Sequence, residues 1–236
     1  MSVFNQDYFK NRGLLKKRAV TLNHFWIRYF KPVTKLSAKR PRLLDLGCGV
    51  GKLLRRVEPY YETVGMDISE WAVEYCNSNL KTTKVTQGDI TNLSSFSDGY
   101  FDIICAFEVL EHIKKEELPG CLNEIKRCLK KGGILLITTP NLLSPLLKVK
   151  KSQWHGFTDK THISLMKPEE WAKLINSVGL DMKYQYGSGL WDTPFIPIIP
   201  AVIQKYLIAA PFIVLFSAGL RFPLNMSDSL IIVASN

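Results

Sequence analysis

Three glycines follow an acidic residue within residues 43–54, LLDLGCGVGKLL, and this spacing could bind a charged small molecule. Asp45 lies in a short apolar run, the pattern of a buried parallel strand. Gly47, Gly49 and Gly51 allow a sharp turn into a helix and let the backbone approach a ligand without a Cβ in the way. The free N–H groups of that helix would point at whatever lies over the loop.

The acid indicates which kind of ligand the loop suits. The loop lacks the Gly-Lys-Ser/Thr ending of nucleoside triphosphate loops. A carboxylate at Asp45, two residues before Gly47, can accept hydrogen bonds from loop amides or attract an ammonium or sulfonium group. The same carboxylate would repel a pyrophosphate. The sequence therefore favours a cofactor that carries positive charge.

Four further stretches accompany this loop. They are TVGMDIS at 63–69, QGDI at 87–90, FDIICAFEVLEHI at 101–113 and CLKKGGILLITTPN at 128–141. Together with the loop, they resemble the class I S-adenosylmethionine-dependent methyltransferases, in particular the small-molecule group that includes the ubiquinone-biosynthesis O-methyltransferases. The resemblance covers roughly residues 40–186.

The resemblance implies S-adenosylmethionine as the cofactor, and it assigns residues to the parts of that molecule. Those expected at the methionine end are Asp45, Gly47, Cys48 and Gly49. Those expected at the ribose and adenine are Asp67, Ile68, Asp89 and Ile90, and Phe107 would lie by the transferred methyl group. A doubly wound domain that has lost its cofactor is the alternative.

Methyl transfer from a sulfonium needs mainly proximity and alignment, and a base only if the acceptor hydroxyl must lose a proton. The candidate bases are His112, just past the fourth predicted strand, and His162, in a DKTHIS segment that resembles an Asp-x-Thr-His segment of relatives. For each, a structural histidine that holds a loop is the alternative. We predict no metal, although Glu108, Glu111 and His112 would share a face if this segment were helical.

The composition suits one α/β domain with additions, because 236 residues can bury a sizeable core. Five cysteines show neither metal-site nor disulfide spacing, which favours buried reduced thiols. The first twelve residues lack the apolar core of a cleavable signal peptide. We therefore expect a cytoplasmic protein and leave membrane association open.

We divide the chain into a basic N-terminal helical segment, 1–41, and a methyltransferase domain, 42–236. Residues 1–42 hold eleven Lys or Arg and one acid, which accounts for the whole net charge of +10. This segment, with a helix predicted over 14–30, could face an anionic substrate, a membrane or RNA, or be a solvated face. Phe-Glu-Val-Leu after the fourth strand, in place of Asp/Asn-Pro-Pro-aromatic, argues against adenine methylation in nucleic acid.

Apolar runs and turn residues place the elements that position these residues. The predicted strands are 42–46, 63–66, 84–88, 101–106, 134–138, 180–186 and 230–234. The predicted helices begin at 52 and cover 70–80, 115–129 and 168–177, with Gly132 and Gly133 as C-cap residues of the third. The resemblance implies a Rossmann-like α/β sheet of order 3-2-1-4-5-7-6 with strand 7 antiparallel.

An apolar insertion, 187–227, precedes the last strand. From 194 to 220 its only charged residue is Lys205, and the uncharged run 206–220 is shorter than the ~20 residues that span a bilayer. Two interpretations stay open: a helical cap over the active site, or a surface that dips into a membrane to reach a lipid.

The predicted function is methyl transfer from S-adenosylmethionine to a small-molecule or lipid-like acceptor, at oxygen. The alternatives are an RNA-modifying enzyme that uses the basic segment, and a non-catalytic module that binds the cofactor and a partner. The side chains of Trp154, His155 and Phe157 could line an aromatic acceptor pocket or simply pack in the protein.

Overall fold

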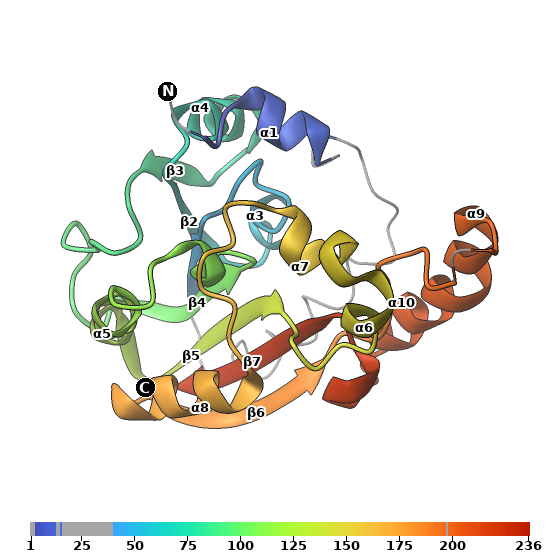
Figure 1. Cartoon of the computed structure of the whole chain (residues 1–236). Helices are drawn as coiled ribbons and strands as arrows, with labels where there is room; N and C mark the ends of the chain where they lie inside the picture. The colour runs from blue at the N-terminus through green and yellow to red at the C-terminus, as the bar shows by residue number, and fades with distance from the viewer. Residues whose placement is uncertain (1–2, 13–14, 16–39, 197) are drawn as a thin grey trace.

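A mixed sheet organises the chain. The computed structural model describes residues 3–12, 15, 40–196 and 198–236. Its seven strands follow the order β3-β2-β1-β4-β5-β7-β6, and β7 runs antiparallel to both of its neighbours (Figure 1). The predicted order and the antiparallel last strand are therefore confirmed.

The strands are β1 (Arg42–Leu46), β2 (Glu62–Asp67), β3 (Lys84–Gln87), β4 (Phe101–Phe107), β5 (Leu129–Pro140), β6 (Asp181–Gly187) and β7 (Ser229–Ser235). The α-helices are α1 (Gln6–Asn11), α3 (Leu54–Val57), α4 (Glu70–Asn79), α5 (Leu118–Cys128), α6 (Leu146–Lys150), α7 (His155–Thr158), α8 (Pro168–Ser177), α9 (Ala201–Gln204) and α10 (Ala210–Ser217). In the described parts of the chain, the 3₁₀ segments are η2 (Leu110–His112), η3 (Lys151–Gln153) and η5 (Leu224–Met226), and the π-helix η4 (Lys205–Ala209) joins α9 to α10.

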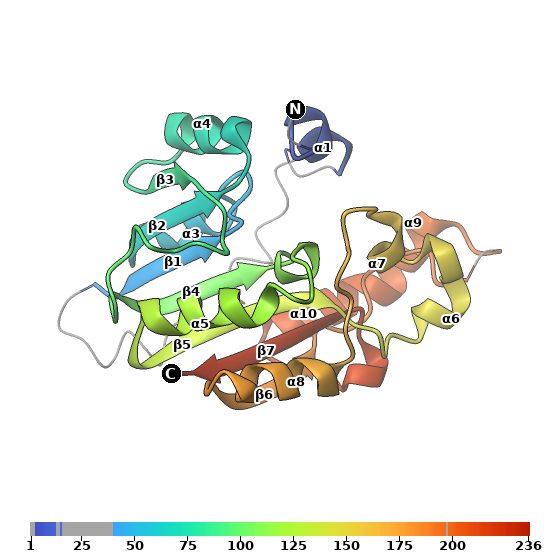
Figure 2. The same cartoon turned by 60° about the vertical axis from the view of Figure 1, so that its left-hand side comes forward.

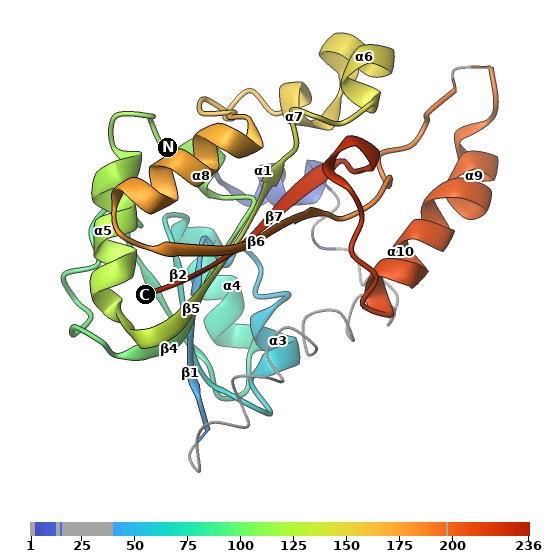
Figure 3. The same ribbon diagram turned by 90° about the horizontal axis from the view of Figure 1, so that it is seen from below.

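Helices cover both faces of the sheet, which explains why its inner strands read as unbroken apolar runs. α5 and α8 lie on one face, whereas α3, α4 and α10 lie on the other (Figures 2 and 3). Successive residues of β1 alternate between these faces: Leu44 and Leu46 join the core under α5 and α8, and Leu43 joins the core under α3. β1 runs parallel to its neighbours β2 and β4, so the carboxyl ends of these three strands meet at one edge of the sheet.

The helix before β5 is shorter than predicted. α5 covers Leu118–Cys128 where 115–129 was expected, and β5 begins at once at Leu129. The prediction that Gly132 and Gly133 cap this helix is wrong, because Leu129 already pairs with Phe101 of β4. Lys130 strengthens that pairing through an ion pair of 2.6 Å with Asp102. Gly132, at φ 74°, lies inside the strand, near an irregular register with β4.

The described part of the N-terminal segment contains one short helix, α1. It begins after Asn5, whose side-chain oxygen accepts a hydrogen bond of 3.1 Å from the Tyr8 N–H. The predicted helix over 14–30, and with it most of the basic segment, lies outside the described residues.

The insertion before β7 is helical, as predicted. α9, η4 and α10 follow one another without a break beside the sheet (Figure 3). Phe216 is buried and Phe212 partly buried in the core under β7 and β6. In the described parts of the chain, no helix has both the length and the apolar character that crossing a membrane requires.

One buried carboxylate joins two connections at the other end of the sheet. Glu58, after α3, accepts hydrogen bonds from the N–H groups of Lys81 and Thr82, both at 3.1 Å, and of Thr83 at 3.3 Å. Burial raises the pKa of Glu58, but these hydrogen bonds outweigh it and the pKa is lowered. The folded state therefore prefers the charged form.

We expect Glu58→Gln to lower the free energy of unfolding by about 2 kcal/mol at pH 7, because an acceptor of charge-assisted hydrogen bonds is removed. Because its pKa is lowered in the folded state, the charged Glu58 carboxylate stabilises the fold at pH values above its unfolded pKa of about 4.3. This stabilisation is lost as the pH falls below that value. Urea denaturation at pH 7 and pH 3 measures both effects. Glu62→Gln, on an exposed carboxylate, is the control, and equal stabilities of the two variants at pH 7 would contradict the assignment.

Candidate functional site

The glycine loop after β1 forms the predicted turn. Gly47, Gly49 and Gly51 have φ values of 62°, 52° and 68°, in the left-handed region that favours glycine. A Cβ on Gly47 would lie 2.4 Å from Cγ2 of Val109, so this position also lacks room for a side chain. The residue types in the loop thus follow from backbone conformation and from close packing against the segment after β4.

Asp67, at the end of β2, holds this loop. Its buried carboxylate accepts a hydrogen bond of 2.7 Å from the Gly49 N–H and one of 2.9 Å from the Ser69 N–H. Burial raises the pKa of Asp67, and the hydrogen bonds only partly offset that effect. The structure therefore brings Asp67 to the loop through its position on the neighbouring strand.

A second carboxyl, Asp45, is buried beside the first. Burial, and then the nearby charge of Asp67, raise the pKa of Asp45 well above its usual range. Two carboxyls of like charge in one buried place would be stabilised by a cationic ligand. The arrangement is suited to a positively charged group above the loop.

Cys48 is a packing residue of the loop in this structure. A hydrogen bond with the side chain of Cys76, and then burial, raise the pKa of the Cys48 thiol well above its usual value. The thiol of Cys76 donates to the Gly49 carbonyl oxygen at 3.1 Å. The environment of Cys48 therefore does not favour a thiolate, and both cysteines are buried free thiols, as expected from the sequence.

The side chains of the other predicted cofactor residues differ in how far they are exposed to solvent. Ile68, after β2, is half exposed, and Asp89, after β3, is exposed and accepts hydrogen bonds from the N–H and hydroxyl of Thr91. The side chain of Ile90 is buried in the core under α5, so only its backbone could face a ligand. Phe107, at the end of β4, is partly buried and packs on the opposite face of the sheet.

The short helix α1 covers the loop, a contact that the sequence analysis missed. Phe9 is buried, stacks on Trp71 of α4 with ring centroids 5.4 Å apart, and would meet a Cβ on Gly49 at 3.3 Å. Asn5 is a good N-cap residue and was the available signal for this helix.

Two histidines meet near the same edge of the sheet. The rings of His112 and His162 lie 4.7 Å apart between centroids. His112 Nδ1 is 2.9 Å from the Thr161 hydroxyl, and burial above all lowers the pKa of His112 to about 4. Burial also lowers the pKa of His162. Both rings are therefore neutral near pH 7, the state that a base needs.

The hydrogen bonds of His162 define which of its atoms could act. Its Nδ1 is 2.8 Å from the Gly156 carbonyl oxygen, which can only accept, so Nδ1 carries the proton and Nε2 the lone pair. Nε2 lies 3.6 Å from the Asp159 carboxylate and 4.0 Å from that of Glu111. His162 is thus both held by the backbone and directed at two carboxyls.

Glu111 is one of several buried side chains among the described residues that have a polar atom without a hydrogen-bond partner. Neither of its oxygens is in hydrogen-bonding geometry with a described residue, and burial, then the charge of Glu108, raise its pKa well above the usual range. Ligand atoms of Glu111, His112 and His162 lie within 4.8 Å of one another, a set that could hold a divalent cation.

The composition of that set differs from the one considered from sequence. Glu108 is exposed, has a φ of 55° and is not among the three residues. Residues 110–112 form a 3₁₀ turn, so the condition of an α-helix, under which Glu108, Glu111 and His112 would share a face, is not met. His162 supplies the third position from a distant segment.

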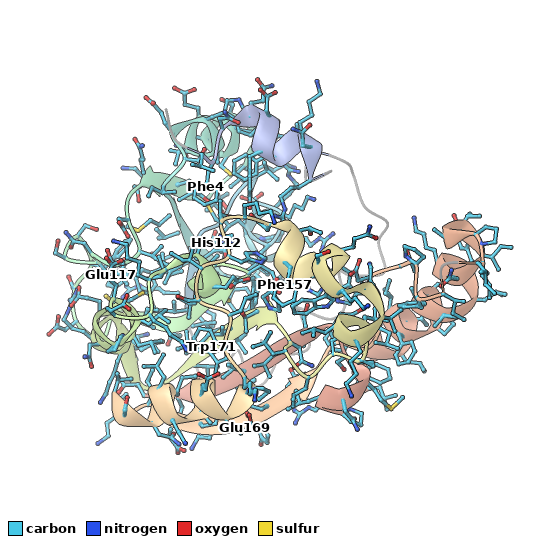
Figure 4. The ribbon with its side chains drawn as sticks, in the orientation of Figure 1. Phe4, His112, Glu117, Phe157, Glu169 and Trp171 are labelled. Carbon is cyan, nitrogen blue, oxygen red and sulfur yellow. The ribbon has the colours of Figure 1, made fainter. Side chains whose placement is uncertain are left out.

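The helix α1 also reaches this cluster. The Asp159 carboxylate accepts a hydrogen bond of 3.1 Å from the Tyr8 hydroxyl and forms an ion pair with Arg12. Phe4 packs edge-on against His112, with ring centroids 5.6 Å apart (Figure 4). One short helix therefore contacts both the glycine loop and the histidines.

The aromatic residues at 154–157 are mainly structural. Trp154 is fully buried with Leu146, Phe195 and Ala209, so it packs α7 against the insertion. His155 lies beside Asp192, and Phe157 remains partly exposed (Figure 4). Packing is the role that the structure supports for Trp154.

Comparison with known proteins gives a family for this arrangement. The model of a family described as "Methyltransferase domain" matches residues 19–185. A probable S-adenosylmethionine-dependent methyltransferase of Mycolicibacterium smegmatis is 26% identical over 206 residues, which is 80% of this chain and 75% of that protein. The ubiquinone biosynthesis O-methyltransferase of Methylococcus capsulatus is 25% identical over 179 residues, 71% of this chain and 74% of that protein.

Other comparisons are narrower or concern the fold alone. The chain spans 26% to 52% of the length of three further curated relatives that it matches. A crystal structure of an S-adenosylmethionine-dependent methyltransferase from Archaeoglobus fulgidus superposes with a TM-score of 0.67 at 22% identity, covering 97% of this chain and 99% of that one. The chain belongs to the methyltransferase-domain family, and the Mycolicibacterium and Archaeoglobus proteins that it is similar to are described as S-adenosylmethionine-dependent methyltransferases.

Proposed function

We propose that this enzyme transfers the methyl group of S-adenosylmethionine to a hydroxyl oxygen of a small-molecule or lipid-like acceptor. The observation that carries the proposal is the pair of buried carboxyls, Asp45 and Asp67, on a left-handed glycine loop at the edge where His112 and His162 meet. The printed function of the Methylococcus relative, O-methylation in ubiquinone biosynthesis, supports oxygen as the target.

In this proposal, the carboxyl edge of the sheet binds the cofactor. Asp45, Gly47, Cys48 and Gly49 hold its methionine end, where the buried negative charge faces the sulfonium. Asp67 and Ile68 contact the ribose and adenine, with Asp89 and Ile90 at the adenine and Phe107 near the methyl group. Bound S-adenosylmethionine supplies an activated methyl on sulfur, so the protein needs chiefly to align the acceptor oxygen for in-line attack.

His162 is the proposed base. Its Nε2 carries the lone pair, since Nδ1 donates to Gly156, and it removes the acceptor's proton as the oxygen attacks. The imidazolium that forms lies 3.6 Å from Asp159, whose negative charge stabilises it. Tyr8 and Arg12 keep that carboxylate in place. His112 packs beside the base and is neutral at the same pH.

The lipid-like nature of the acceptor is proposed from the insertion. Residues 194–220 include exposed apolar side chains and pack, through Ala209, on the α6–α7 segment that leads to His162. We include in the proposal a membrane-surface contact through this stretch. Water-soluble acceptors would not require it.

Asp67→Ala should weaken S-adenosylmethionine binding at least about tenfold, because a carboxylate that orders the loop and contacts the ribose is lost. Isothermal titration with the cofactor and with S-adenosylhomocysteine measures the change. Asp98→Ala, on an exposed acid paired only with Arg127, is the matched control and should bind as the wild type does. An unchanged affinity of Asp67→Ala in a folded protein would refute the assignment.

His162→Gln should lower the turnover number by about 10²- to 10⁴-fold and leave cofactor affinity unchanged, because the base is removed and the loop is not. Transfer of a labelled methyl group to a lipid extract of the native organism provides the assay. His155→Gln, in the same segment but outside the cluster, should retain activity. Activity that is lost on chelation and restored by Mg²⁺ would contradict the role of base and make His162 a cation ligand.

A further inference from the structure

One helical surface of the insertion is apolar and uncovered. The run 201–217 exposes the large apolar side chains Val202, Ile203, Tyr206, Leu207, Val214 and Leu215. Along a helix with one π turn, this spacing places them on one side, which we call the apolar ridge. Gln204, Ala209 and Phe216 on the opposite side are buried. The helix is therefore apolar nearly all round, although a helix on a water-facing surface normally has a polar side.

The loop before this helix extends the ridge and is held in a fixed shape. Ile198 is 90% exposed at its tip. The buried Gln204 side chain accepts hydrogen bonds from the N–H groups of Phe195, at 2.5 Å, and Ile196, at 2.7 Å. It also donates to the carbonyl oxygens of Ile196 and Ile199. The side-chain donors and acceptor of Gln204 are all used by backbone groups of this loop. These hydrogen bonds hold the loop in the conformation that exposes its apolar tip.

The charges around the ridge have one sign. No Asp or Glu occurs from 193 to 227, whereas Lys205 and Arg221 are exposed at its flank and its end. Lys148 and Lys151, on the neighbouring α6–η3 segment, are exposed as well. Leu146 and Leu147 of that segment pack with Ile208 and Ala209, which places these cations next to the helix. The described residues of the insertion from 193 to 227 thus combine exposed apolar side chains with cations and include no acid.

We propose that the apolar ridge inserts into the headgroup and upper acyl region of an anionic lipid bilayer. Apolar side chains with flanking Lys and Arg suit such an interface, where lipid tails need no hydrogen bonds and phosphates neutralise the cations. A protein partner or second copy would normally be matched by polar contacts at about one hydrogen bond per 100–200 Å², and the ridge offers few groups for them. The functional role of this membrane contact rests on the lipid-like acceptor of the proposed function.

The position of the ridge explains how such an acceptor reaches the base. Ala209, on the buried side of the helix, packs with Trp154. Gly156, two residues further along, accepts the hydrogen bond that orients His162. Trp154 and Gly156 thus connect the packing of this helix to the position of the proposed base, and we expect an acceptor anchored in the bilayer to enter on this side of the domain.

Vesicle co-sedimentation of the full chain, without cofactor or acceptor, tests the inference. The probes are phosphatidylcholine vesicles with and without about one-third phosphatidylglycerol, at low and at physiological salt. We expect binding to anionic vesicles and a loss of partitioning of at least about tenfold in Leu207→Glu/Val214→Glu. Tyr60→Glu, on an exposed aromatic residue after α3, is the matched control and should partition as the wild type does.

Three results would overturn the inference. One is an absence of binding to both kinds of vesicle; another is binding that the double variant leaves unchanged, which would assign it to the basic N-terminal segment. The third is a concentration-dependent dimer in size-exclusion chromatography that the double variant abolishes, without vesicle binding. Titration of the same samples with S-adenosylmethionine separates these results from a failure of the proposed function. Cofactor binding does not involve the ridge, so it should persist even if vesicle binding is absent.

Discussion

The site depends on the contact between the Asp67 carboxylate and the amide of Gly49. It joins the end of β2 to the loop after β1, and so determines where the left-handed glycines place their backbone. Asp45 is buried beside it, and burial and the nearby Asp67 carboxyl raise the pKa of Asp45, which disfavours its charged form unless a cation lies nearby. A cationic sulfonium is the ligand that would best stabilise this arrangement, which gives the cofactor of the family a physical basis in this chain.

The helix α1 connects the two halves of the site. Phe9 covers the glycine loop, while Tyr8 and Arg12 hold the Asp159 carboxylate next to His162. The glycine loop and the His112–His162 pair are therefore not structurally independent. A change in α1 would alter both the cover over the loop and the charge beside the proposed base.

The helix of the insertion has one buried side and one exposed side. β6 and β7 complete the sheet, and Phe216 in the insertion seals part of its face. The opposite side of the same helix remains apolar and open. Packing alone does not require those exposed side chains, because the protein core is already covered by Phe212, Phe216 and Phe222.

The sequence by itself determined the strands and the loop with Asp45 and Asp67, because these features depend on local periodicity and on short-range turn chemistry. The sheet order was expected from the resemblance to the family. It also indicated a helical insertion. It failed at Gly132 and Gly133, where pairing with β4 replaced a helix cap. The α-helix that would have grouped Glu108 with Glu111 is a 3₁₀ turn in the structure.

Only the tertiary structure decided that His162 meets Glu111 and His112, that α1 closes over Gly49, and which side of the insertion stays exposed. These contacts join segments that lie far apart in the chain. Their partners are selected by packing across the whole domain, and no local pattern of residues records that selection.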